Sequence, residues 1–333
     1  MTSTTTDAAG VLGTGFYVPE RALTNFDLEK MVDTSDEWIV ERTGIHERRI
    51  APPDVPASEL AYQAAIRALA DARTAPEEID LIICATLTGD AVCPSTASFI
   101  QAKLGASRAA AFDLTAACSG FVYSSIVATQ FIQSGVYRRI LVIGVEVLSH
   151  FLDWTDRNTC VLFGDGAGAA VYGPVEKGFG ILGFDMGCDG TGTGALGIAS
   201  GDRGRALLEG QKQNCVYMNG AEVFKFAVRA MGATLKRSLE NAGIDEKEVD
   251  WLVPHQANIR IIQSAAKRLA LPPEKVIINI GKYGNVSAAS IPMALAEAAG
   301  EGRFKKGDVV VLAGFGAGLT WASCIMRWAK EDL

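Results

Sequence analysis

The sequence predicts an α/β protein made of two similar halves. Hydrophobic residues make up 49% of the 333 positions and 35 glycines are spread along the chain, a composition that fits tight α/β packing. Continuous apolar runs such as Leu81–Ala85 and Val309–Ala313 suit strands of a sheet that is buried on both faces. The third observation is an internal repeat.

The repeat has an offset of about 170 residues. Ala57–Ala85 reads as an amphipathic helix, a short acidic loop and a buried strand, and the same plan returns in Phe224–His255. A second similarity follows in the same order, because the strand Arg139–Gly144 resembles Asp308–Gly314. Two generic α/β stretches are the alternative explanation.

We place the junction of the halves near Pro174–Gly178, which gives an N-terminal half 1–175 and a C-terminal half 176–333. Gly-rich connections at Gly187–Gly197 and Gly201–Gly210 are expected to be loops near the site or the subunit interface.

Composition excludes several functional classes. The seven cysteines are an odd number without the spacing of zinc pairs, so neither a disulfide framework nor a metal site is expected. The net charge of −7 argues against broad nucleic-acid binding but leaves room for a local basic patch. The polar start Met1–Gly10 and the lack of a long apolar run predict a soluble, cytoplasmic protein without a membrane segment.

Cys118 is the most informative residue. The β-type stretch Phe112–Leu114 leads to this thiol, and a small-residue turn then opens a helix from Phe121 to about Gln133. The amino end of that helix is expected to lower the pKa of the thiol and to favour the thiolate nucleophile. A buried structural cysteine is the alternative.

Two further polar residues follow buried segments. His255 comes directly after the strand Trp251–Pro254, at the carboxyl end where α/β proteins usually carry their chemistry. Asn285 lies in a small-residue turn before the helix Ile291–Ala299, where a turn-forming role is the alternative.

Two glycine-rich segments resemble ligand loops. Gly314–Gly318 is predicted to be a strand-to-strand turn whose N–H groups can face an anion, although a plain tight turn is the alternative. Gly164–Gly168 is predicted to be a strand-linking turn, because it lacks the ending of a nucleotide-binding loop and leads into a strand.

In this order, the segments around Cys118, His255, Asn285 and the last glycine turn resemble the β-ketoacyl-acyl-carrier-protein synthase III family of condensing enzymes. The similarity also includes Thr34–Val40 and covers nearly the whole chain after about Val11. It implies a thiolase-like five-layer αβαβα fold made of two pseudo-duplicated halves.

The resemblance implies a Cys–His–Asn site. Cys118 would take an acyl group from acyl-coenzyme A, with its own N–H and that of Gly316 or Ala317 holding the oxyanion. Malonyl-acyl carrier protein then loses carbon dioxide, and His255 and Asn285 donate hydrogen bonds to the resulting enolate. The product is a 3-oxoacyl-acyl carrier protein that initiates fatty-acid or related polyketide synthesis.

Binding residues carry over in the same way, with acyl-coenzyme A as a substrate and no permanently bound cofactor. Trp38 and Arg42 resemble the pair that encloses the adenine. The other residues expected to bind coenzyme A are Thr34, Arg157 at the nucleotide phosphates, and Phe224, Ala227 and Asn258 along the pantetheine tunnel.

The family resemblance also suggests partners. Arg260, Lys267 and Arg268 fall nearly on one helix face and are expected to meet the acidic carrier protein, although a solvated basic face is the alternative. Cys93 stands where relatives carry a bulky residue that reaches the acyl pocket across a homodimer. Its small size predicts a roomier pocket.

Three alternative functions remain at this point. A family offshoot can pass the acyl group to another acceptor without condensation, but such offshoots often alter the asparagine that is retained here as Asn285. A Cys–His hydrolase requires water at the acyl group. A non-catalytic acyl-binding homologue is expected to lack the nucleophile, whereas this chain has Cys118.

Overall fold

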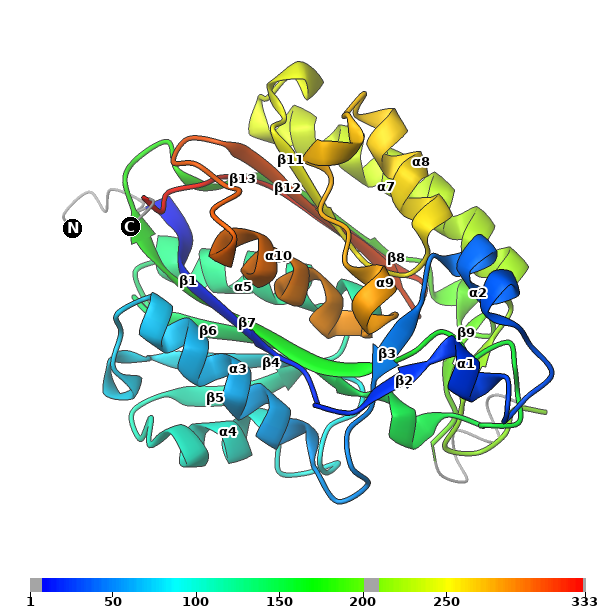
Figure 1. Ribbon diagram of the computed structural model, residues 1–333. Coiled ribbons are helices and arrows are strands. Elements are labelled where there is room, and N and C mark those ends of the chain that lie inside the picture. The colour runs from blue at the N-terminus through cyan, green and yellow to red at the C-terminus, as the bar shows by residue number, and fades with distance from the viewer. Residues whose placement is uncertain (1–7, 201–209, 332–333) are drawn as a thin grey trace.

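The computed structural model describes residues 8–200 and 210–331, and its strands form two large sheets (Figure 1). The predicted loop Gly201–Gly210 lies outside these residues except for its last position. The first sheet has the order β1 (Ala8–Tyr17), β7 (Asp165–Val175), β6 (Ile140–Val147), β4 (Leu81–Ala85) and β5 (Ala110–Leu114). The second has the order β11 (Trp251–Pro254), β12 (Val309–Gly316), β13 (Thr320–Arg327) and β8 (Gly180–Cys188).

Helices complete five layers, as Figure 1 shows. Two helices lie between the sheets, two cover the outer face of the first sheet, and two cover the outer face of the second. In that order they are α5 (Gly120–Gln133) and α10 (Ser290–Gly300), α3 (Ala57–Asp71) and α4 (Thr96–Leu104), and α7 (Gly220–Ala242) and α8 (Ile259–Arg268). The predicted five-layer αβαβα arrangement is confirmed.

Shorter elements lie outside the two large sheets. Two antiparallel pairs and three short helices make up this part of the chain. They are β2 (Ala22–Thr24) with β3 (Glu47–Arg49), β9 (Leu196–Ile198) with β10 (Val216–Met218), α1 (Asn25–Leu28), α2 (Asp36–Thr43) and α9 (Ile280–Tyr283).

The two halves repeat one topology. The order of neighbouring strands in the first sheet, β1-β7-β6-β4, matches β8-β13-β12-β11 in the second. Where β5 pairs with β4, the second half has an isolated parallel bridge between Leu252 and Val276. We therefore propose that the halves divide at Val175, between β7 and β8.

The repeat extends to the backbone at the centre of the molecule. The 3-10 turn Ala117–Ser119 precedes α5, and the equivalent turn Ser287–Ala289 precedes α10. Ala117 and Ser287 both have left-handed backbone conformations, with φ of 46° and 43°. Such strain in non-glycine residues typically marks a functional site.

Glycines predicted as turns partly belong to strands. β7 begins at Asp165, so Gly166 and Gly168 are strand residues, which corrects the prediction of a turn over Gly164–Gly168. The reason is the close approach of α10: a Cβ on Gly168 would lie 2.5 Å from the Met293 nitrogen. Only a residue without a side chain allows this helix to pack on the strand.

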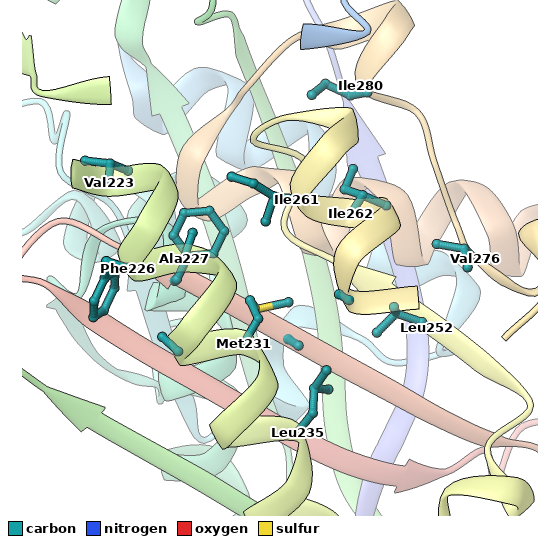
Figure 2. Close-up of a cluster of buried hydrophobic side chains, with 14 of the residues drawn as sticks. Val223, Phe226, Ala227, Met231, Leu235, Leu252, Ile261, Ile262, Val276 and Ile280 are labelled. Atoms are coloured by element: carbon teal, nitrogen blue, oxygen red, sulfur yellow. The ribbon is translucent and has the colours of Figure 1, made fainter. Parts of the chain in front are cut away.

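The outer layer of the second half has its own core. Met231 and Leu235 of α7 and Ile261 and Ile262 of α8 are buried in one cluster with Leu252 of β11 (Figure 2). Burying this apolar surface fixes both helices on the sheet. It thereby positions the amino end of α8 beside the site.

Candidate active site

Cys118 lies in the 3-10 turn Ala117–Ser119, at the point where the two sheets approach each other. Gly316 of β12 packs directly on it, because a Cβ at that glycine would lie 2.6 Å from the Cys118 nitrogen. Thr320 Oγ1 donates to the Ala116 carbonyl at 3.0 Å and secures the turn to β13. Only 6% of Cys118 is exposed, yet it lines the main cavity.

Burial dominates the ionisation of this thiol. Desolvation raises the pKa of Cys118 to about 12, although a nearby Ser287 hydroxyl lowers it in part. The expected lowering by the helix start is therefore wrong in sign, because removing the thiolate from water outweighs the helix dipole. Cys118 is therefore a thiol near neutral pH and would have to lose its proton to act as a nucleophile.

His255 is positioned by both its backbone and its ring. Its N–H donates to the Ala313 carbonyl at 2.8 Å, and its Nδ1 lies 2.6 Å from Ser290 Oγ. The ring also meets Phe315 edge-on at 5.4 Å between centroids. Burial lowers the pKa of His255 to about 3, so the imidazole is neutral at physiological pH.

Asn285 is held in a short bridge to the first half. It pairs with Phe163, and its N–H donates to the Leu162 carbonyl at 2.9 Å. Its Oδ1 accepts a hydrogen bond from the Ser287 N–H at 2.9 Å. Because the oxygen is engaged there, the amide NH₂ remains available as a donor to a ligand.

These three residues line one cavity of about 1580 Å³, whose lining also includes residues of α2 and of the start of α8. The structure thus brings together Cys118, His255 and Asn285, which are far apart in the sequence. Of the other predicted site residues, the cavity lining includes Trp38, Arg42, Phe224, Asn258 and Ala317.

The mouth of the cavity carries a stacked cluster of side chains. Arg42 and Arg157 both lie over the Trp38 ring, at 4.7 and 4.6 Å from its centroid. Asn258 caps α8 and donates its Nδ2–H to the Arg42 carbonyl at 2.7 Å, which ties α8 to α2. Thr34 precedes α2 in the sequence. Its Oγ1 is buried and has no hydrogen-bond partner among the described residues.

Arg260, Lys267 and Arg268 are exposed on α8, as predicted. Arg260 lies over the Phe224 ring at 5.6 Å, which places it at the cavity mouth. The exposed Lys225 and Arg229 of α7 extend this basic face. Sequence reasoning missed these two, although their spacing of four residues puts them on one side of a helix.

Three predicted residues lie elsewhere. Ala227 is fully buried in the α7–α8 core and is not part of the cavity lining, which corrects its expected place in the tunnel (Figure 2). Gly316 packs against the backbone of Cys118 and does not line the cavity. Cys93 is exposed and is also outside the cavity lining.

Sequence reasoning missed several residues at the cavity. Ala257 and Ile261 line its outer part, and Ser287 lines it beside Cys118. Ser290 contacts His255 from a position 35 residues later in the chain. Ala257 lies close to His255 in the sequence and Ser290 close to Asn285, but their contacts depend on the tertiary structure.

Two searches of the described ranges, 8–200 and 210–331, gave negative findings. They contain no cluster of three or more His, Cys, Asp or Glu residues arranged to hold a metal. No helix in these ranges has the length and apolar character needed to cross a membrane.

Two segments of the chain match known families. Residues 112–190 match 3-oxoacyl-[acyl-carrier-protein (ACP)] synthase III, and residues 239–328 match the C-terminal family of the same description. A relative from Desulfitobacterium hafniense, a beta-ketoacyl-[acyl-carrier-protein] synthase III, is 55% identical over 98% of this chain and 99% of its own.

Solved structures give the same result. The 3-oxoacyl-[acyl-carrier-protein] synthase III from Aquifex aeolicus matches with a TM-score of 0.90 and 49% identity, covering 96% of this chain and all of that one. The priming β-ketosynthase of a polyketide biosynthetic pathway matches with a TM-score of 0.90 and 35% identity, over 98% of both chains.

Proposed function

The chain belongs to the β-ketoacyl-acyl-carrier-protein synthase III family, and we propose that Cys118, His255 and Asn285 carry out its condensation. That condensation initiates fatty-acid synthesis. The observation that supports this assignment most strongly is the convergence of the three buried side chains on one cavity.

The first half-reaction is acyl transfer to Cys118. The sulfur attacks the carbonyl carbon of acyl-coenzyme A, the carbon–sulfur bond to coenzyme A breaks, and an acyl-cysteine forms. The N–H groups of Cys118 and of Gly316 or Ala317 stabilise the oxyanion. The tight packing of Gly316 on Cys118 supports this geometry. In this assignment the enzyme is an acyltransferase, with acyl-coenzyme A as substrate.

The second half-reaction is decarboxylation and carbon–carbon bond formation. Loss of carbon dioxide from the malonyl thioester leaves an enolate, whose carbon attacks the acyl-cysteine and releases the Cys118 thiolate. Ser290 supports a donor role for His255: its Oγ accepts from the Gln256 N–H at 3.3 Å, so its own hydrogen can point at Nδ1. The ring hydrogen is then on Nε2, which donates to the enolate together with Asn285.

The mouth of the cavity suits coenzyme A. Arg42 and Arg157 stacked on Trp38 offer cations for the phosphates and an aromatic face for the adenine. Thr34 has a buried hydroxyl available nearby, and Phe224 and Asn258 continue the cavity inward toward Cys118.

The basic face of α7 and α8 suits an acidic carrier protein. We assign malonyl-acyl carrier protein docking to the exposed Lys225, Arg229, Arg260, Lys267 and Arg268. Arg260 supports this assignment, because it borders the cavity through which the malonyl arm must enter.

A homodimer and a cytoplasmic location are part of the proposal. β5 lies at the edge of the first sheet with its backbone unpaired on one side among the described strands, so a second copy can extend the sheet there. In such a dimer the exposed Cys93 can reach the partner's acyl pocket. Sedimentation velocity tests the dimer.

A two-step mass experiment distinguishes condensation from acyl transfer to another acceptor. The enzyme is first mixed with a panel of acyl-coenzyme A esters, and intact mass reports the acyl-enzyme and the preferred primer. Malonyl-carrier protein is then added. We expect loss of the acyl group together with carbon dioxide and a 3-oxoacyl product. Turnover of the acyl-enzyme without carbon dioxide contradicts the condensing assignment.

A further inference from the structure

Glu146 is a fully buried carboxyl group near the carboxyl end of β6. One of its oxygens, Oε2, accepts hydrogen bonds from the Thr88 hydroxyl at 2.6 Å, the Leu87 N–H at 3.2 Å and the Thr86 hydroxyl at 3.3 Å. These donors fix the carboxyl group behind the wall of the cavity. The proposed chemistry assigns no role to it.

The other oxygen faces the turn Ser287–Ala289. Gly144 lies two residues before Glu146 and therefore on the same face of β6. A Cβ on Gly144 would lie within 2.2 Å of the Ala288 carbonyl, so the turn rests directly on this face of the strand. Glu146 Oε1 and Ser287 Oγ are both buried there, and neither makes a hydrogen bond of ordinary geometry among the described residues.

Ser287 lines the cavity together with Cys118, and its turn packs on the face of β6 that carries Glu146. Its hydroxyl is close enough to both residues to lower the pKa of Cys118 and the pKa of Glu146. The left-handed backbone of Ser287 and the bond from its N–H to Asn285 hold it in this position.

Acylation needs a group that can accept the thiol proton. The neutral imidazole of His255, with a pKa of about 3, is a poor acceptor. Desolvation raises the pKa of Glu146 to about 7, although the donors at Thr88 and Leu87 lower it in part. A general base works best when its pKa is near the working pH, so this carboxylate is the better match.

We propose that Glu146 takes the proton of the Cys118 thiol through the Ser287 hydroxyl and keeps it until condensation is complete. This inference rests on the proposed acylation of Cys118. Glu146 and Ser287 thereby become proton-handling residues of the first half-reaction.

The proton balance closes over the two half-reactions. In acylation the Cys118 S–H bond breaks, its proton moves to Ser287 Oγ, and the hydroxyl proton moves to Glu146 Oε1. The departing coenzyme A thiolate takes a proton from solvent. In condensation the released Cys118 thiolate recovers its proton from Glu146 by the same route. Between the steps Glu146 is neutral, so it does not repel the malonyl carboxylate or the enolate.

Alkylation of Cys118 by iodoacetamide, followed residue by residue with peptide mass spectrometry, tests the proton path without any acyl substrate. We expect the wild-type rate to rise through about pH 7 as Glu146 ionises, and Glu146→Gln to lose this rise and to react about 10²-fold more slowly near pH 8. The amide keeps the acceptor that Thr88 and Leu87 require.

A purely electrostatic role predicts the opposite sign. The negative charge of Glu146 raises the pKa of Cys118, so removing it alone would make alkylation faster. An equal or faster rate in Glu146→Gln therefore overturns the proposal. Ser287→Ala, which keeps the carboxylate, must also lose the rise near pH 7, and it decides the question if the first variant does not fold.

Asp165→Asn is the matched control. Asp165 is also a fully buried carboxylate at the first sheet, but its partners are Ser149 and the Ala51 N–H. We expect this variant to keep the wild-type rise, and loss of the rise in it also contradicts the proposal. The other titratable group that interacts with Glu146 is Cys84 of β4, whose pKa is raised well above 9.0 by burial and nearby carboxylates, so it does not titrate near pH 7.

The experiment separates this inference from the proposed function. If acyl-coenzyme A does not acylate wild-type Cys118, the proposed function fails, whatever the alkylation profile. If acylation occurs but Glu146→Gln shows the wild-type alkylation profile, only the proton path fails.

Discussion

At the residue scale, the reactivity of Cys118 follows from how closely two backbones approach. Ala117 is held in the left-handed region with φ of 46°, and Gly316 of the opposite sheet leaves no room for a side chain. These constraints bury the thiol, and the burial raises its pKa so that it is protonated near neutral pH. Protection from solvent and the need for a proton acceptor thus have the same cause.

Gly316→Ala tests this close approach. The added methyl would lie 2.6 Å from the Cys118 nitrogen and 3.1 Å from the Ala117 Cβ, so the turn must shift. Because misplacing one oxyanion donor typically costs 10²–10³ in rate, we expect acyl-enzyme formation to fall by about 10²-fold. Gly190→Ala, where a methyl meets nothing within 4 Å, is the control. Rapid-quench mass spectrometry measures both, and equal acylation rates would refute the constraint.

At the element scale, α7 and α8 present one basic surface although the chain carries a net charge of −7. The apolar sides of the two helices share a core, which aligns their exposed sides (Figure 2). Arg268 Nε also lies near Gly232 of α7, so the two helices are in contact at the surface. A carrier protein can therefore contact both helices at once.

Charge reversal on α8 should affect one half-reaction. We expect Arg260→Glu with Lys267→Glu to raise the KM for malonyl-carrier protein at least about tenfold at low salt, with a smaller effect at high salt. Acylation by acyl-coenzyme A should continue. The control is Lys247→Glu with Lys305→Glu, which makes an equal change of charge. These exposed lysines precede β11 and β12, at the strand ends away from the cavity. Equal losses in both double variants would place docking elsewhere.

Local patterns predicted the elements well and the contacts between elements poorly. The helix predicted after Cys118 is observed as Gly120–Gln133, and the strand predicted before His255 is observed as Trp251–Pro254. The pairing of His255 with Ser290 depends on how α10 lies between the sheets, which no local pattern encodes. Glu146 did leave a signal: it is a single charge inside the apolar strand Ile140–Val147, and buried carboxylates are rare.

At the scale of the whole molecule, both halves of the duplicated fold contribute to the proposed active site. The first half supplies Cys118 at the start of α5, and the second half supplies Asn285 just before α10 and His255 after β11. The two equivalent 3-10 turns meet at the centre, and the position equivalent to Cys118 is Ala288. One copy of the turn thus carries Cys118, while the other carries Ser287 and packs on the face of β6 that carries Glu146.

The buried carboxyl group makes folding stability depend on pH. The pKa of Glu146 is raised from 4.5 to about 7, so between these values the folded chain binds a proton that the unfolded chain has lost. The free energy of unfolding must therefore fall as the pH rises through this window, by roughly 3 kcal/mol from this group.

Glu146→Gln should remove that loss. We expect the stability of the variant relative to wild type to increase from about pH 5 to about pH 8, as measured by denaturant unfolding at each pH. Ser125→Ala, a buried hydroxyl variant in α5, should differ from wild type by a constant amount. A constant difference for Glu146→Gln as well would mean that Glu146 is ionised throughout.

In the proposed function, the first half performs acylation and the second half supplies the donors for condensation. Asn285→Asp preserves the size of the side chain but replaces the donating amide with a negative acceptor that faces the enolate. Acyl-enzyme formation and malonyl decarboxylation are measured separately in this variant. We predict near-normal acylation of Cys118 and a loss of condensation of about 10³-fold. Near-normal condensation, or an equal loss in both half-reactions, would contradict the account.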